Sequence, residues 1–103
     1  MVYNVIITRR AKYLFDNLVG YIIYSLKNPQ AASNLRDSVE KTISRIKDNP
    51  YQFSRLMYKN WDNKDYRGAV VSNMKYIIVY KISKNNIYIM GIFHMKEKID
   101  DKI

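Results

Sequence analysis

The chain has 103 residues, enough for one hydrophobic core and too few for two, so we expect a single domain over residues 1–103. Its 18 basic and 9 acidic side chains give a net charge of +9, which favours an anionic partner such as nucleic acid, an acidic protein or an anionic membrane. It contains no cysteine, which excludes disulfides and thiolate metal sites, and no signal peptide or apolar stretch of membrane-spanning length, so we expect a cytoplasmic protein with no membrane partner.

The chain is predicted to begin with a strand and a helix. Residues 2–7 are rich in β-branched side chains and alternate weakly, which indicates a strand buried on at least one side. Thr8 ends this strand and can cap a helix over residues 9–26, where apolar side chains recur every three or four positions. The helical stripe comprises Ala11, Leu14, Phe15, Leu18, Ile22 and Leu26.

A second helix follows a short break. Asn28 supplies a cap oxygen and Pro29 suits the first helical turn, so the pair ends one helix and begins the next. The second apolar stripe runs to Asn49-Pro50, where a helix cannot easily continue. Its members are Ala32, Leu35, Val39, Ile43 and Ile46. The short turn predicts an antiparallel helical hairpin.

The remainder combines an aperiodic segment with three strands. Residues 51–64 mix aromatic and basic side chains without a clear period, and long ordered connections are often functional. Strands are predicted over residues 66–71, 75–82 and 87–93, separated by turn residues, which indicates an antiparallel meander. Residues 95–103 are expected to form a short final turn or a frayed end. The element order is β-α-α-β-β-β.

Short sequence pieces along this order recur in one known family. They are Thr8 at the end of the first strand, Tyr21-Ile22, Asn28-Pro29 with Ala31-Ala32, Asn49-Pro50, Tyr66-Arg67, Val71-x-Asn73, Tyr80-x-Ile82 and Ile92-Phe93-His94. Together they resemble the RelE/ParE superfamily of toxins from bacterial type II toxin-antitoxin modules, over nearly the whole chain. The resemblance implies an α+β fold in which an N-terminal helical hairpin packs on a twisted antiparallel sheet.

The resemblance also implies a toxin that inhibits growth unless an acidic antitoxin covers it. RelE-like members are ribosome-dependent mRNA endonucleases, and ParE-like members block DNA gyrase. Cleaving RNA without a metal requires a base, a phosphate-binding cation and an acid. The positions of the family's strand lysines fall on Gly68 and Val70, and that of its strand arginine falls on Ile77. These departures favour a ParE-like gyrase inhibitor over a RelE-like nuclease and leave open whether the chain is an enzyme.

If the chain is a nuclease, its catalytic candidates are Arg67, His94 and Lys96. Arg67 could clamp a phosphate or an acidic antitoxin side chain, or it could instead form an ion pair with Asp62 or Asp65. His94 has a suitable intrinsic pKa for acid-base work, but a lone histidine at a strand end is often structural. The predicted target or antitoxin contacts are Arg55, Tyr58, Lys59, Trp61 and Lys75. No cofactor or metal is expected, and an exposed hairpin stripe would permit a dimer or a toxin-antitoxin hetero-oligomer.

Overall fold

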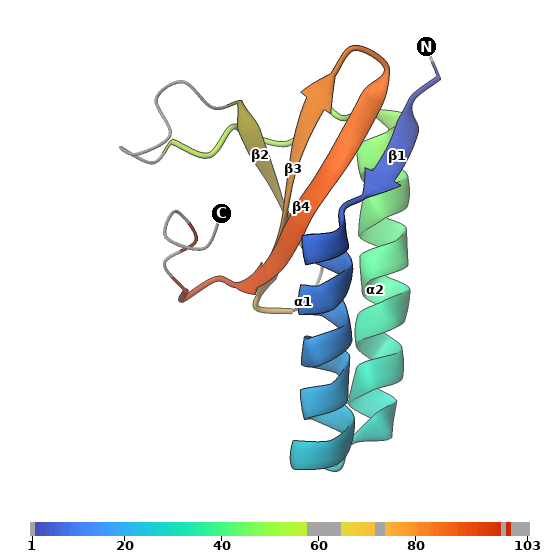
Figure 1. Ribbon diagram of the computed structural model, residues 1–103, viewed down its shortest axis with the longest axis vertical. Helices are drawn as coiled ribbons and strands as arrows, with labels where there is room; N and C mark the ends of the chain where they lie inside the picture. Colours follow the sequence, from blue (N-terminus) through green and yellow to red (C-terminus); the bar gives the residue numbers. More distant parts are fainter. Residues whose placement is uncertain (1, 58–64, 72–73, 98, 100–103) are drawn as a thin grey trace.

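A computed structural model describes residues 2–57, 65–71, 74–97 and 99. The elements are β1 (Asn4–Ile7), α1 (Arg9–Gly20), a π-helical turn η1 (Tyr21–Ser25), α2 (Pro29–Asp48), β2 (Tyr66–Val70), β3 (Tyr76–Ser83) and β4 (Asn86–His94). This order confirms the predicted α+β fold, a helical hairpin layered on a four-stranded sheet (Figure 1). No helix in the described part of the chain combines the length and the apolar character needed to cross a membrane.

The sheet is mixed. Its strand order is β1-β4-β3-β2, and β2, β3 and β4 form the predicted antiparallel meander. β1, however, pairs parallel with β4, so the expected antiparallel arrangement holds for the meander and not for the first strand. Side-chain alternation indicates which residues share a face but not the direction of a neighbouring strand, which depends on how the helical hairpin returns the chain to the sheet.

Each α-helix begins after a residue whose side chain caps its first turn by a hydrogen bond. The Thr8 hydroxyl accepts a hydrogen bond from the N–H of Ala11 (3.1 Å) and donates one to the carbonyl of Ile89 (2.8 Å), so it caps α1 and ties it to β4. The Asn28 side chain accepts a hydrogen bond from the N–H of Ala31 (3.1 Å), as predicted for α2.

The first helix differs from its prediction at its end. After Gly20 the α-helix changes to the π-helical turn, which shifts the side chains that follow around the helix axis. Leu26, expected on the buried stripe, is 56% exposed, and Tyr21, the first residue of the π-helical turn, is 55% exposed. The left-handed backbone of Lys27 (φ 50°) then reverses the chain into α2.

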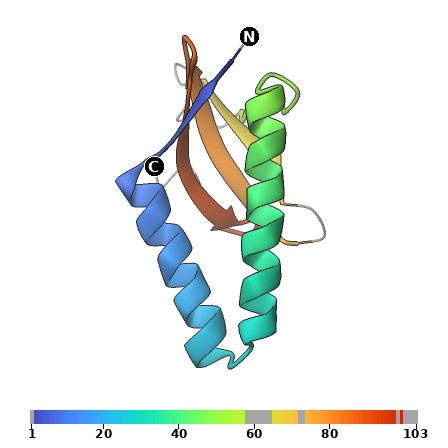
Figure 2. The ribbon, with the colours of Figure 1, turned by 90° about the vertical axis from the view of Figure 1, so that its right-hand side faces the viewer.

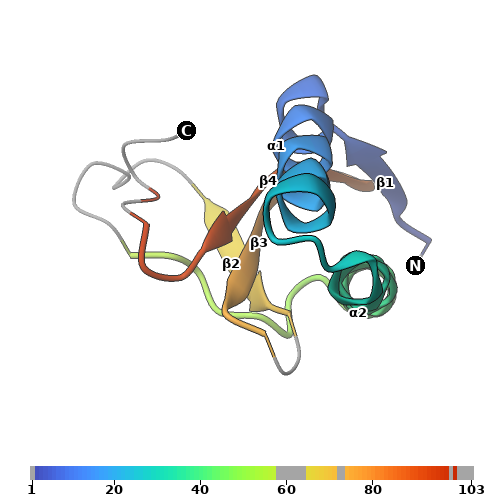
Figure 3. The same cartoon turned by 90° about the horizontal axis from the view of Figure 1, so that it is seen from below.

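The sheet buries apolar side chains on both faces. Helices α1 and α2 both lie on one side of β2 and β3 (Figure 3), and their stripes pack on side chains such as Ile78, Tyr80 and Ile87. On the other face Tyr66, Ile77, Val79, Phe93 and Ile99 form a second cluster. Ile99 is only 2% exposed and residues 95–97 form a turn, so of the two expectations for the chain after β4, a short final turn or a frayed end, the described residues fit the turn.

The two helices lie side by side along only part of their length. They lie close together at the hairpin tip, where η1 packs against α2, and diverge toward the sheet (Figure 2). This divergence leaves the space between them open over the sheet.

Candidate functional site

Arg67, on β2, supports the segment that follows α2. Its Nη1 donates a hydrogen bond to the carbonyl of Phe53 (2.8 Å), and its guanidinium lies 5.1 Å from the centre of the Tyr51 ring. The Nε atom is buried and has no hydrogen-bond partner among the described residues. Asp65, one of the two predicted ion-pair partners, instead pairs with Arg55 (2.8 Å). Arg67 is therefore held mainly by backbone and aromatic contacts of residues 51–53.

Tyr80 lies beside Arg67 on β3 and is fully buried. Its hydroxyl donates a hydrogen bond to the carbonyl of Pro50 (2.6 Å). Burial raises the pKa of Tyr80 to about 12, against a smaller opposing effect of the Arg67 charge. The phenol therefore stays protonated near neutral pH and does not supply a general base.

His94 and Lys96 lie at the end of β4. The His94 ring packs edge-on against Tyr76, with ring centres 5.5 Å apart. Its Nδ1 accepts a hydrogen bond from the backbone N–H of Lys96 (3.2 Å), and its own backbone N–H donates to a carboxylate oxygen of Glu97 (3.3 Å). The Lys96 side chain is exposed. These contacts stabilise the turn after β4, which is the structural role weighed for His94.

The structure does not bring Arg67 and His94 together. Arg67 pairs with Tyr80 on β3. His94, on β4, pairs with Tyr76, which lies on β3 four residues before Tyr80. With about 3.3 Å per residue and about 4.8 Å between strands, the two backbones lie roughly 13 Å apart along the sheet and roughly 10 Å apart across it. In the structure Arg67 is held against residues 51–53 and the His94 ring packs against Tyr76, so the two side chains do not meet at one site.

Two of the three positions where nuclease members carry cations, Gly68 and Ile77, are used for packing. A Cβ atom added at Gly68 would lie 2.6 Å from Cδ1 of Ile77 and 2.9 Å from Cδ2 of Leu56, so the glycine makes room for a buried isoleucine. Ile77 is 9% exposed and belongs to the second cluster. Val70, which pairs with Ile77, is 45% exposed. A lysine at position 68 would have to displace this packing.

The predicted contact residues do not form one surface in the described part of the chain. Arg55 is paired with Asp65, and Lys75 is exposed just before β3. Lys75 lies near the end of β2 that is farther from Arg67, so these two cations do not lie side by side. Tyr58, Lys59 and Trp61 lie outside the described residues. Among the described residues, no three histidine, aspartate or glutamate side chains gather closely enough to hold a metal ion.

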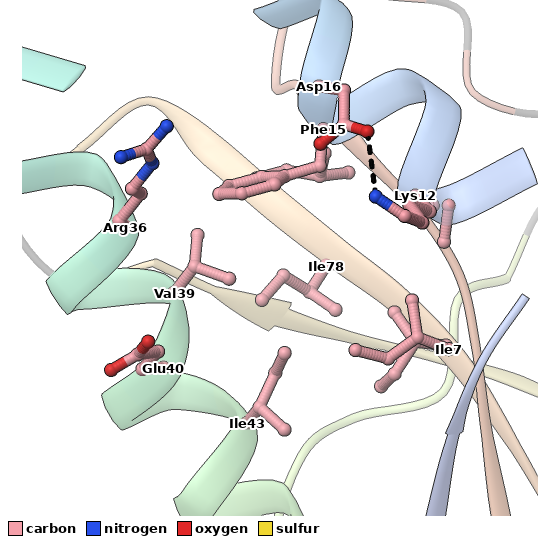
Figure 4. A pocket seen from close by; sticks show the side chains of 13 residues that line it. Ile7, Lys12, Phe15, Asp16, Arg36, Val39, Glu40, Ile43 and Ile78 are labelled. Atoms are coloured by element: carbon pink, nitrogen blue, oxygen red, sulfur yellow. Dashed lines mark hydrogen bonds and ion pairs between the residues drawn. The ribbon is translucent and has the colours of Figure 1, made fainter. Parts of the chain in front are cut away.

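A groove lies between α1 and α2, over the sheet, and its position between the two helices was not predicted from the sequence. It encloses about 440 Å³ and is lined by Ile7, Ala11, Lys12, Phe15, Asp16, Arg36, Val39, Glu40, Ile43, Ile78, Ile89, Gly91 and Ile92. Figure 4 shows Phe15 from α1 and Val39 and Ile43 from α2 around a floor that includes Ile78. Its volume falls in the range of about 300–1,000 Å³ that is usual for ligand sites.

The rim of the groove carries charges of both signs. On α1, Nζ of Lys12 lies 3.0 Å from a carboxylate oxygen of Asp16. Arg36 and Glu40 lie on the α2 side (Figure 4). An apolar floor with a polar rim is the composition of a protein-binding surface rather than of an acid-base catalytic centre. The apolar stripes in the sequence predict that these side chains lie on one face of each helix. They do not predict that the helices diverge and leave the side chains uncovered.

Two of three comparisons with known proteins gave a match. The model of one protein family, described as the ParE toxin of the type II toxin-antitoxin system parDE, matches residues 5–99. Among solved structures, a chain of the chromosomal ParDE TA system from P. aeruginosa superposes with a TM-score of 0.73 at 13% sequence identity, covering 90% of this chain and 96% of that one. The search of curated proteins gave no significant match.

Proposed function

We propose that this chain, which belongs to the ParE toxin family of type II toxin-antitoxin systems, arrests bacterial growth by inhibiting DNA gyrase and not by cutting RNA. The observation that carries the proposal is the packing of Gly68 against Ile77 at the positions where nuclease members carry cations. The separation of Arg67 from His94 supports it, because a metal-free ribonuclease needs its cation and its acid or base at one phosphodiester.

We place the antitoxin over the groove between α1 and α2. Apolar antitoxin side chains in contact with Phe15, Ile43 and Ile78 would supply most of the affinity, since buried apolar anchors dominate binding energies. The net charge of +9 would speed the encounter with an acidic antitoxin. We expect the toxin and antitoxin to associate in the cytoplasm as a hetero-oligomer.

The mode of toxicity is tested by expressing the chain from a tightly controlled promoter in a bacterial host. Growth, messenger RNA integrity and plasmid supercoiling are followed in the same cultures, and supercoiling by purified gyrase is assayed with and without the purified chain. We expect growth arrest, intact messages and reduced supercoiling. Arrest with fragmented messages and unaffected gyrase would overturn the proposal and point to a ribosome-dependent nuclease.

Two single substitutions separate these mechanisms further. In a nuclease that uses Arg67 and His94, Arg67→Gln or His94→Ala should abolish toxicity while antitoxin binding remains. For a surface-contact inhibitor we expect His94→Ala to arrest growth within a few-fold of the wild type, since among the described residues the ring packs against Tyr76 and the turn that follows β4. Circular dichroism of both purified variants controls for unfolding.

The groove is tested by Ile43→Glu, which places a charge on its apolar wall. We expect this variant to arrest growth but to escape neutralisation by a co-expressed antitoxin of the module, because a carboxylate buried against apolar side chains is costly. Ser44→Glu is the matched control, because Ser44 is exposed and does not line the groove. Equal neutralisation of the two variants would exclude the groove as the antitoxin site.

A further inference from the structure

Two arginines lie against aromatic rings where α2 ends, next to β2. The guanidinium of Arg45 is 5.3 Å from the centre of the Phe53 ring, and that of Arg67 is 5.1 Å from the centre of the Tyr51 ring. Nη1 of Arg67 also donates to the carbonyl of Phe53 (2.8 Å), so the two pairs are adjacent. We call Arg45, Tyr51, Phe53 and Arg67 the arginine–aromatic cluster.

Backbone hydrogen bonds hold the segment beside this cluster in place. The N–H of Leu56 donates to the carbonyl of Tyr66 on β2 (2.8 Å), so residues 54–56 run along the outer edge of that strand. Arg55 forms an antiparallel bridge with Arg67, which sets the two residues directly opposite each other. A third guanidinium therefore lies next to the cluster, in a position fixed by the backbone.

The cluster is open to solvent. Arg45 is exposed, Tyr51 is 57% exposed, and Arg67 is partly buried. Beneath them, the buried Tyr80 bonds the carbonyl of Pro50 and packs edge-on against Phe53. The cluster therefore offers cations and an accessible aromatic ring on a rigid base.

Most cations here have no carboxylate partner. Asp65 pairs with Arg55 (2.8 Å), but Arg45, Lys47 and Arg67 form no ion pair within the part of the chain that the structure describes. Arg45 and Lys47 lie in the last turn of α2, where cations offset the negative end of the helix dipole. Their remaining donors are available to an anion, and guanidinium groups bind phosphate oxygens especially well.

The aromatic ring distinguishes between possible anionic partners. The net charge of +9 attracts acidic proteins and nucleic acids alike. An acidic peptide would use the cations but has no particular need for an open ring, whereas a single-stranded nucleic acid stacks its bases on aromatic side chains while cations follow its phosphates. The bases of a duplex are already stacked on one another, so the exposed ring of Tyr51 favours a single strand.

We propose that the arginine–aromatic cluster binds single-stranded nucleic acid, with phosphates on Arg45 and Arg67 and one base stacked on Tyr51. This inference goes beyond the proposed function, because it requires neither gyrase nor an antitoxin. The surface adjoins β2, at the opposite end of the strand order from β1, and shares no residue with the groove. Binding here does not entail cleavage, because the neighbouring Tyr80 phenol stays protonated and supplies no general base.

The test is fluorescence anisotropy of a labelled oligothymidylate of about 12 nucleotides, titrated with the purified full chain. We expect Arg45→Gln to weaken binding about tenfold through loss of a charged hydrogen bond. Lys27→Gln is the matched control. It removes the same charge from the hairpin turn, at the other end of α2 (Figure 1). At about 1.5 Å per helical residue, this turn lies about 27 Å from Arg45. Its affinity should stay within about twofold of the wild type.

Tyr51 provides a second, independent pair of variants. Tyr51→Leu keeps an apolar side chain but removes the ring, and we expect it to weaken binding about tenfold, since stacking contributes about 1–3 kcal/mol per base. Tyr51→Phe keeps the ring and should bind like the wild type. Thermal unfolding of each variant separates the two roles, because a residue that only supports the fold lowers the melting temperature without changing the affinity of the folded protein.

Salt and competitors complete the test. Two phosphate contacts on a single strand predict a slope of log affinity against log salt of about −1.4, which Arg45→Gln should reduce by about 0.7. Equal losses in Arg45→Gln and Lys27→Gln, or wild-type affinity of Tyr51→Leu, would refute the inference in favour of general charge attraction. Equally tight binding of a duplex of the same length, stronger displacement by polyglutamate than by unlabelled strand, or no binding up to about 1 mM would also refute it.

Discussion

Tyr80→Phe tests the interpretation of Tyr80 as a structural residue and not a catalytic one. The substitution removes one buried hydrogen bond and leaves the carbonyl of the buried Pro50 without its donor. Losing a neutral hydrogen bond and leaving one acceptor unpaired costs about 1–2 kcal/mol of unfolding free energy near neutral pH. Because the phenol stays protonated near neutral pH, we expect toxicity per folded molecule to remain unchanged.

The pH dependence of the same variant gives a sharper result. The pKa of Tyr80 is raised from 10.0 to about 12 in the folded chain, so the wild type keeps this contribution to stability below pH 10 and loses it as the pH rises toward 12. The linkage relation gives a loss of about 1.4 kcal/mol by pH 11. Phenylalanine cannot ionise, so the stability gap between wild type and variant should close or reverse by that pH.

Urea unfolding of both proteins at a series of pH values between 7 and about 11 measures this gap directly. The effects of all other groups are common to both proteins and cancel in the difference. A gap that stayed constant or widened with pH would refute the assignment of a buried, protonated phenol. Loss of toxicity in a stably folded Tyr80→Phe variant would instead indicate a catalytic role.

Three further substitutions test how the chain forms this structure. Gly20→Ala should raise the unfolding free energy by about 0.5–1 kcal/mol in thermal or urea denaturation, because Gly20 has helical dihedrals and nothing lies within 4 Å of the added Cβ. Gly68→Lys should lower stability by about 1–3 kcal/mol, because its Cβ meets Ile77, and it should generate no RNA cleavage in a ribosome-dependent assay. Thr8→Ala should cost about 0.5–2 kcal/mol through loss of the cap on the Ala11 N–H, observed as a lower urea midpoint.

The elements that sequence analysis predicted correctly are those specified by local chemistry. The caps at Thr8 and Asn28 and the turn residues between strands act within a few positions, so their effect is visible in the sequence. The parallel pairing of β1 and the π-helical turn at residues 21–25 depend on how distant elements pack, and no local pattern indicates them. The same is true of the buried Ile99, whose neighbours come from three strands.

Some features of the candidate site could likewise be predicted from the sequence, and others could not. The departures at Gly68 and Ile77 were visible in the sequence, and the structure adds their physical reason, which is that the Ile77 side chain fills the space that a side chain at position 68 would need. The contacts of Arg67 with residues 51–53 span too long a separation to be predicted from spacing. The groove was hidden because an apolar stripe looks the same whether its helix packs on a neighbour or diverges from it.

If the chain inhibits its target by contact and does not cut RNA, mutations should affect its toxicity and its neutralisation by the antitoxin differently. If toxicity depends on surface contact with the target, no single side chain carries it and single substitutions should reduce it gradually. If the antitoxin binds the groove as proposed, neutralisation in contrast depends on a few apolar contacts, and one added charge there disrupts a buried contact. Substitutions that release the toxin from its antitoxin should then be found on the groove-facing sides of α1 and α2, and most of them should leave the toxin active.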